Sequence, residues 1–229
     1  MKTSILGIAA LILISFTTSE VNIPYSKMLC LLEISQNNDK DFLLHYFEQT
    51  FDTLQNSIEG LSKTQLEYKP SEDKWSVSQC LDHIVMTEKM LLGMSRELLA
   101  QPANPERIKD VKISDSELID GMTDRSFKAT APDELQPAGK YTAPSTALQD
   151  LEKERVEIME FIAQTSLDDL RSHITDSPFG PLDAYHSILY IAAHTARHTE
   201  QIKEVMGDSG FPANEVEGSQ IQNNIDKIR

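Results

Sequence analysis

The chain has 229 residues, of which 40% are hydrophobic and 25% are charged, a composition typical of one globular domain with or without short extensions. Acidic residues outnumber basic ones by 36 to 21, and the net charge is -15. This charge argues against a nucleic-acid partner, because phosphate backbones are bound by surfaces rich in lysine and arginine. The two cysteines are too few for a zinc ribbon or a disulfide framework.

The N-terminus has the composition of a secretory signal. Lys2 precedes an apolar run over residues 5–16, and the small residues 17–19 follow it. The run is short for a membrane span. We therefore expect residues 1–19 to be a signal peptide and the protein to be exported to the periplasm or outside the cell. The alternative is an uncleaved segment that anchors the chain to a membrane.

Residues 20–37 form an N-terminal arm between this segment and the first periodic stretch. Cys30 lies in the arm, whereas Cys80 falls on a predicted helix. We expect no disulfide between them, because Cys80 is predicted to be buried in the folded domain.

Two amphipathic helices are predicted in the first half of the domain. Apolar residues recur every three or four positions after Asn38, and Gly60 marks the end of the first helix. Ser76 and Gln79 form a capping box that opens the second helix. Trp75, just before this cap, is interpreted as a staple on the helix entry rather than as a substrate platform.

Residues 101–144 carry five of the ten prolines and no long period, so they are predicted to form an extended crossover. A third helix begins at Pro144, residues 165–176 form a turn region, and a fourth helix covers residues 182–206. Residues 208–229 are a polar tail. Four helices without convincing strands predict an all-α four-helix bundle over residues 38–207. The long crossover lets helices 2 and 3 run parallel, which gives an up-down-down-up topology.

A candidate metal site comes from three histidines. His194 and His198 are four residues apart, so their side chains lie one above the other on the fourth helix. His83 lies on a flank of the second helix, and facing flanks of a bundle can hold cofactors. Three neutral imidazoles with an open position suit a divalent metal such as zinc or nickel. The alternative is that these are ordinary histidines at the edge of the core.

Other candidate residues are assigned simpler roles. Cys80 is one turn before His83 and is read as a small buried residue rather than as a ligand. His186 is predicted near the opposite face of its helix, and His45 and His173 are predicted on the surface.

Glu88 and Arg155 interrupt the apolar stripes of the second and third helices. A buried charge needs a partner, so one hypothesis is that they pair across these helices. The alternative is that each long side chain reaches solvent.

Three short motifs, in order and spacing, resemble the DinB-like family. They are Lys74-Trp75-Ser76 with Cys80-Leu81-Asp82-His83-Ile84, then Phe179-Gly180-Pro181-Leu182, then residues 194–202. The resemblance covers about residues 39–206. It implies a four-helix bundle in which His83, His194 and His198 hold a divalent metal. It also implies a fold similar to that of thiol-dependent S-transferases and maleylpyruvate isomerases.

The leading functional hypothesis is a metal-dependent hydrolase or thiol S-transferase that acts on a small molecule. An open position on the metal would acidify a water or a thiol. We see no dependable general base. Arg197 is predicted to lie on the surface, and the alternative is a supporting position next to the metal ligands. The second hypothesis is a non-catalytic bundle that binds a metal or small ligand, or that forms a homodimer.

Overall fold

The computed structural model describes residues 38–128 and 130–213. The predicted signal peptide, the arm with Cys30 and most of the polar tail lie outside these residues, so the predictions for export, anchoring and the missing disulfide stay predictions. Within the described residues, no helix has the length and apolar character needed to cross a membrane.

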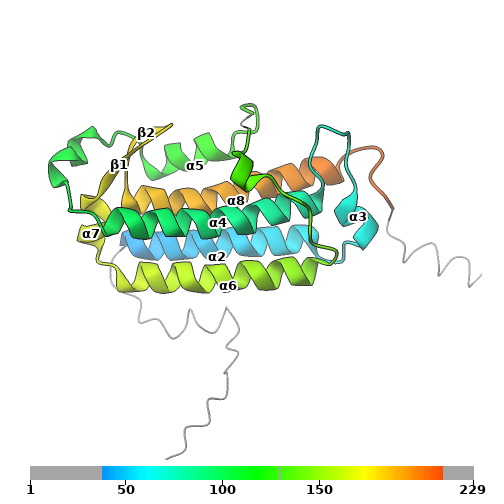
Figure 1. Ribbon diagram of the computed structural model, residues 1–229, viewed down its shortest axis with the longest axis horizontal. Helices are drawn as coiled ribbons and strands as arrows, with labels where there is room; N and C mark the ends of the chain where they lie inside the picture. The colour runs from blue at the N-terminus through cyan, green and yellow to red at the C-terminus, as the bar shows by residue number, and fades with distance from the viewer. Residues whose placement is uncertain (1–37, 129, 214–229) are drawn as a thin grey trace, which may run out of the picture. The chain divides into compact units, whose positions relative to one another are not determined.

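Four long helices make up the bundle: α2 (Asn38–Ile58), α4 (Val77–Leu99), α6 (Pro144–Gln164) and α8 (Ala184–Met206). Helices α2 and α8 run in one direction and α4 and α6 in the other (Figure 1). Helix α8 packs against α2 and α4, and α6 packs against the same two helices. The predicted all-α bundle with up-down-down-up topology is confirmed.

The predicted capping box at the start of α4 is present. The Ser76 hydroxyl accepts a hydrogen bond from the Gln79 backbone N–H, and the Gln79 side chain accepts one from the Ser76 N–H. At the start of α8, the Asp183 carboxylate accepts a hydrogen bond from the His186 N–H. These caps fix where both site-bearing helices begin, and therefore which residues face each other across the bundle.

The sequence predicts an extended crossover over residues 101–144, but the structure contains helices there. It contains two short 3₁₀ helices, η1 (Pro105–Asp110) and η2 (Asp133–Leu135), and the α-helix α5 (Asp115–Thr123). Helix α5 begins at a capping box between Ser114 and Glu117 and packs along α8 (Figure 1). Its buried Leu118 and Met122 lie one turn apart, so α5 covers α8 through a small apolar face.

Short elements fill the connections between the long helices. Helix α3 (Lys63–Glu67) precedes α4, and α7 (Leu167–Ser172) follows α6. The expectation of no strands is wrong for residues 174–183, where β1 (Ile174–Ser177) and β2 (Gly180–Asp183) pair as an antiparallel hairpin with Ile174 opposite Asp183. Gly180 has a φ of 94° at the turn, a conformation that L side chains rarely adopt.

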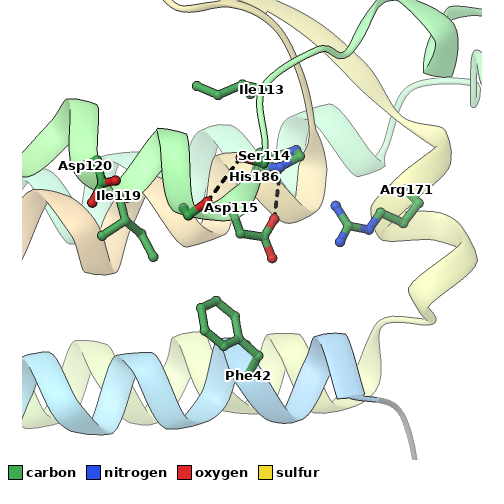
Figure 2. Close-up of a pocket in the computed structure, with 9 residues that line it drawn as sticks. Phe42, Ile113, Ser114, Asp115, Ile119, Asp120, Arg171 and His186 are labelled. Atoms are coloured by element: carbon green, nitrogen blue, oxygen red, sulfur yellow. Dashed lines mark hydrogen bonds and ion pairs between the residues drawn. The ribbon is translucent and has the colours of Figure 1, made fainter.

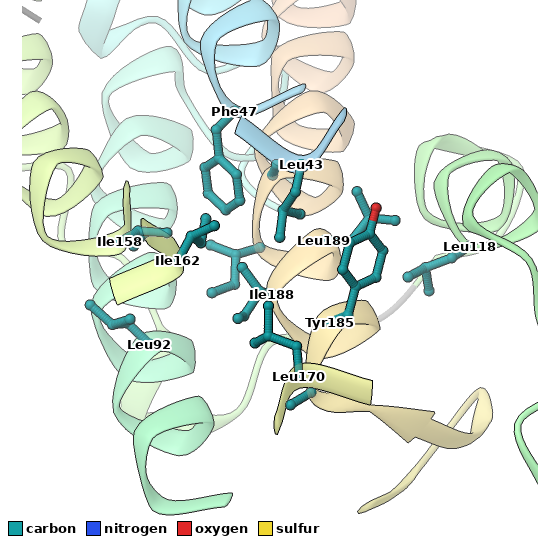
Figure 3. Packing of buried hydrophobic residues seen from close by; sticks show 13 residues of the cluster. Leu43, Phe47, Leu92, Leu118, Ile158, Ile162, Leu170, Tyr185, Ile188 and Leu189 are labelled. Carbon is teal, nitrogen blue, oxygen red and sulfur yellow. The ribbon is translucent and has the colours of Figure 1, made fainter. Parts of the chain in front are cut away.

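Apolar side chains from all four long helices fill the interior (Figure 3). Among them, Phe47 from α2, Leu92 from α4, Ile158 from α6 and Ile188 from α8 are buried almost completely. Burial of this kind supplies most of the stability of a bundle, at about 25 cal/mol per Å² of apolar surface.

A charged pair lies inside this apolar interior. The Arg155 guanidinium donates to both carboxylate oxygens of Glu88, with N–O distances of 2.6 to 2.9 Å. Arg155 also donates to the Phe47 carbonyl and the Thr50 hydroxyl, and the Thr195 hydroxyl donates to Glu88. The predicted pairing of Glu88 with Arg155 is confirmed, and the network joins all four long helices.

Candidate metal centre

His83, His194 and His198 converge between α4 and α8. The Nε2 atom of His194 lies 3.3 Å from Nε2 of His83 and 3.1 Å from Nε2 of His198. Four ligands at zinc–nitrogen distances of 2.0–2.1 Å in a tetrahedron are separated by about 3.3–3.4 Å. The three side chains are 3%, 8% and 7% exposed. Their nitrogens are therefore spaced and sheltered as a divalent ion would require.

Acceptors on the outer ring nitrogens favour the tautomer that a metal needs. His83 Nδ1 donates to the Leu135 carbonyl over 2.9 Å, and His198 Nδ1 donates to the Gln201 side-chain oxygen over 2.9 Å. A neutral imidazole with its proton on Nδ1 has a free lone pair on Nε2. Among the described residues, the buried Nδ1 of His194 has no hydrogen-bond partner. Two of the three imidazoles are thus held with Nε2 available for coordination.

Burial also keeps the three imidazoles neutral. It lowers the pKa of His194 to about 3, with a further contribution from His83. It lowers the pKa of His198 well below the usual value, and it lowers that of His83 against the opposing effect of the Leu135 carbonyl. Because a metal competes with a proton for the same lone pair, a low pKa leaves these nitrogens free at neutral pH.

Aromatic rings border the cluster. The Trp75 ring lies with its centroid 4.8 Å from that of His83 and is stacked on His198 at 5.9 Å. Tyr190 is stacked on His194 at 6.2 Å. The interpretation of Trp75 as only a staple on the helix entry is therefore incomplete, because its half-buried ring forms one wall of the site.

The crossover contributes to the site, which the sequence did not predict. Leu135, the acceptor for His83, is the last residue of η2. Arg197 is buried and donates to the backbone carbonyls of Met122, Asp124 and Phe127. The prediction of a surface position for Arg197 is wrong, because its guanidinium holds the crossover against α8.

The remaining histidines do not join the cluster. His45 is exposed, as predicted, with a side chain 72% accessible. The surface position predicted for His173 is wrong, since this buried ring contacts the carbonyls of Asp169 and Gln101. Cys80 is fully buried and is not part of the group of potential ligands found among the described residues.

His186 is also buried rather than on an outer face of the protein. Its Nε2 lies 3.1 Å from an Asp115 oxygen and its Nδ1 lies 2.8 Å from an Asp183 oxygen. Together with Arg171 and Phe42, it lines a groove of about 690 Å³ beside α5 (Figure 2). His186 precedes His194 by two helical turns, or about 12 Å along α8, so this groove is separate from the histidine cluster.

Comparisons with known proteins bear on the fold and the family of the chain. YuaE of Bacillus subtilis (strain 168) is 30% identical over 152 residues, which are 66% of this chain and 88% of YuaE. The solved structure of YfiT from Bacillus subtilis, described as a probable metal-dependent hydrolase with an unusual four-helix bundle topology, is similar with a TM-score of 0.52 and 14% identity. That similarity covers 78% of this chain and 93% of YfiT. The family model of the DinB superfamily matches residues 46–202, and the chain belongs to this superfamily.

Proposed function

We propose that this protein is a metal-dependent hydrolase whose divalent ion is held by Nε2 of His83, His194 and His198. The observation that carries the proposal is the separation of 3.1 and 3.3 Å between these nitrogens, with two of the three rings fixed in the required tautomer. Ordinary histidines at the edge of a core have no reason to bring three Nε2 atoms together at one position.

Three nitrogen donors favour a borderline ion such as zinc or nickel over magnesium or calcium, which prefer oxygen ligands. Three protein ligands leave a fourth position open, as in catalytic zinc sites. The chemistry that such an ion supplies when bound is Lewis acidity, which lowers the pKa of a water or thiol at the open position.

The protein's own residues would orient and shelter this centre. Leu135 and Gln201 hold protons on the outer nitrogens of His83 and His198, while Trp75 and Tyr190 keep bulk water from the imidazole rings. Exclusion of water strengthens electrostatic interactions inside a site.

Two nearby carboxylates are already committed to other bonds and are poor candidates for a general base. Asp82 accepts hydrogen bonds from two backbone N–H groups of the crossover. Glu88 is held by Arg155 and Thr195. A metal-activated nucleophile would reduce the need for a separate base, which is consistent with a hydrolase of this type.

The description of YfiT as a probable metal-dependent hydrolase supports the same reaction class, since the two proteins share the fold. No observation favours thiol transfer over hydrolysis, although both would use the same open position. Thiol transfer is therefore an alternative outcome of the test.

The test is metal loading followed by assay. The purified protein would be loaded with zinc or nickel, its metal content measured by elemental analysis, and its activity measured on esters, amides and thiol acceptors. We expect one ion per chain and hydrolysis that His83→Ala removes. The matched control is His45→Ala, whose side chain is exposed and should not matter.

Three results would count against the proposal. Binding of one ion without hydrolysis would favour a non-catalytic metal-binding module, and activity with thiols alone would favour an S-transferase. Hydrolysis of equal rate in His83→Ala would show that the activity arises elsewhere.

A further inference from the structure

A segment of the crossover is bonded along the face of α4 that carries His83. We call this segment, residues 135–141, the strap. The Ser78 hydroxyl donates to the Tyr141 carbonyl over 2.7 Å, and the Gln79 side chain donates to the Pro137 carbonyl over 3.4 Å. His83 itself donates to the Leu135 carbonyl. The strap therefore reaches the histidine cluster through a series of bonds to one helix face.

Asp82 is the charged member of this series. Its Oδ2 accepts hydrogen bonds from the backbone N–H groups of Ala138 at 3.0 Å and Gly139 at 3.1 Å. The residue is only 3% exposed, and a buried carboxylate is costly unless hydrogen bonds satisfy it. The Lys140 ammonium lies farther away, at 3.7 Å from Oδ1. The two N–H groups are therefore the direct partners of the Asp82 charge.

Gly139 allows the strap to approach Asp82. Its φ is +76°, and a Cβ atom at this position would lie 3.0 Å from Cγ of Gln79. Gln79 cannot move aside freely, because its side-chain oxygen completes the capping box of α4. Any side chain at position 139 would strain the backbone and push the strap away from the helix.

The strap in turn decides where the proton of His83 resides. The Leu135 carbonyl can only accept a hydrogen bond, so it selects the tautomer with the proton on Nδ1. Without that carbonyl, the alternative tautomer with a proton on Nε2 becomes accessible, and that tautomer cannot coordinate a metal through Nε2. By holding the strap, Asp82 thus influences the tautomer of His83, the next residue along the helix.

We propose that Asp82 is a positioning residue for the metal centre: by holding the strap, it fixes His83 in the tautomer and orientation that leave Nε2 free. This inference rests on the proposed metal site. The Asp82 charge also acts on His83 directly, because it opposes the lowering of the His83 pKa by burial. Gly139→Ala keeps this charge, so that variant isolates the action of Asp82 through the strap.

The experiment compares Asp82→Asn with the wild-type protein. The ring nitrogens of His83 would be observed by two-dimensional proton–nitrogen NMR in metal-free protein, and zinc affinity would be measured by competition with a chelator. We expect the wild-type ring to carry its proton on Nδ1 and the variant ring to populate both tautomers. Zinc affinity should fall about 10- to 100-fold, the usual effect of losing such an outer contact.

Two further variants make the result decisive. Glu134→Gln changes an exposed carboxylate next to Leu135 and should leave both the tautomer of His83 and the zinc affinity unchanged. Gly139→Ala keeps Asp82 but displaces the strap, so it should reproduce the effect of Asp82→Asn even if that variant folds poorly.

The proposal is overturned if His83 keeps its proton on Nδ1, or if zinc affinity is unchanged, in both Asp82→Asn and Gly139→Ala. A fall in affinity without a change of tautomer also contradicts it. The failure of the proposed function is distinguishable, because a wild-type protein that binds no metal would still show the tautomer of His83 and its dependence on Asp82.

Discussion

Arg155 and Glu88 form a fully buried ion pair at the centre of the bundle, with both side chains at 0% exposure. The pair joins α6 to α4, while the other bonds of the same groups reach α2 and α8. Thr195, which donates to Glu88, directly follows His194 and lies in the helical turn between His194 and His198. The network therefore helps to set how α4 and α8 face each other, on which the convergence of the histidines depends.

Removing one member of this pair should be strongly destabilising. Glu88→Leu leaves the Arg155 charge buried without its carboxylate, and we expect a loss of about 3–5 kcal/mol in the free energy of unfolding. The double variant Glu88→Leu/Arg155→Met should recover part of this loss, because no charge then stays buried. Urea unfolding of the two single variants and the double variant measures the coupling.

An exposed pair between the same two helices is the control. Arg96 and Glu157 lie 3.5 Å apart with half-exposed side chains, so their removal should change stability by only about 0–1 kcal/mol. Additive effects of Glu88→Leu and Arg155→Met would contradict the account of the central network.

His186 should make the stability of the protein depend on pH. Burial alone would lower the pKa of His186, but the carboxylates of Asp115 and Asp183 outweigh it and raise the pKa from 6.5 to about 9. A raised pKa in the folded state stabilises the protein fully below pH 6.5, and this stabilisation is lost as the pH rises through 9. At about 1.4 kcal/mol per pKa unit, the contribution is about 3 kcal/mol.

The stabilisation by His186 and its two carboxylates is also lost at low pH. His186 lowers the pKa values of Asp115 and Asp183, on which burial acts in the opposite direction, so their contribution is lost as the pH falls below about 4. We therefore expect His186→Gln to be less stable than wild type at pH 6 and nearly as stable at pH 10. His45→Gln, an exposed histidine, should show no such difference. A constant gap between His186→Gln and wild type from pH 6 to 10 would contradict a charged His186.

Cys80 should be chemically inert in the folded protein. Burial raises the pKa of its thiol to about 12, and only the thiolate reacts readily with alkylating reagents. In a Cys30→Ser background, iodoacetamide at pH 8 should modify Cys80 only after unfolding in guanidinium chloride. Rapid modification of the folded protein would show that the thiol is more accessible than its position on α4 indicates. Cys80→Ala should also keep its metal content, since this thiol is not placed among the ligands.

Short-range sequence patterns are sufficient to predict the helical bundle and its main helices. The spacing of His194 and His198, the capping box at Ser76 and the interrupted stripes at Glu88 and Arg155 are all short-range patterns that the structure reproduces. Helix α5 had such a signal as well. Ser114 and Glu117 form a capping box before Leu118 and Met122, but the many prolines of the crossover hid this helix.

The mistakes share a physical cause. Helix α8 is covered by α2 and α4 and also by α5, so it has little solvent face, and a single apolar stripe does not describe its burial. For this reason the stripe predicts Arg197 on the surface and His186 near the opposite face of its helix, although each finds partners on the crossover. The role of Leu135 as acceptor for His83 depends on a backbone carbonyl 52 residues away, and a backbone group leaves no trace in the sequence.

Trp75 offers the most direct test of the three-histidine centre. It is the single tryptophan of the chain, and its ring lies 4.8 Å from the His83 ring and 5.9 Å from the His198 ring. A paramagnetic ion bound to these histidines should quench its fluorescence. Titration with Ni²⁺ should therefore quench the emission saturably at one ion per chain, and Zn²⁺ should compete for the same site. His194→Ala should abolish the quenching, and His45→Ala should keep it. Saturable quenching that survives in both His83→Ala and His194→Ala would contradict the metal centre.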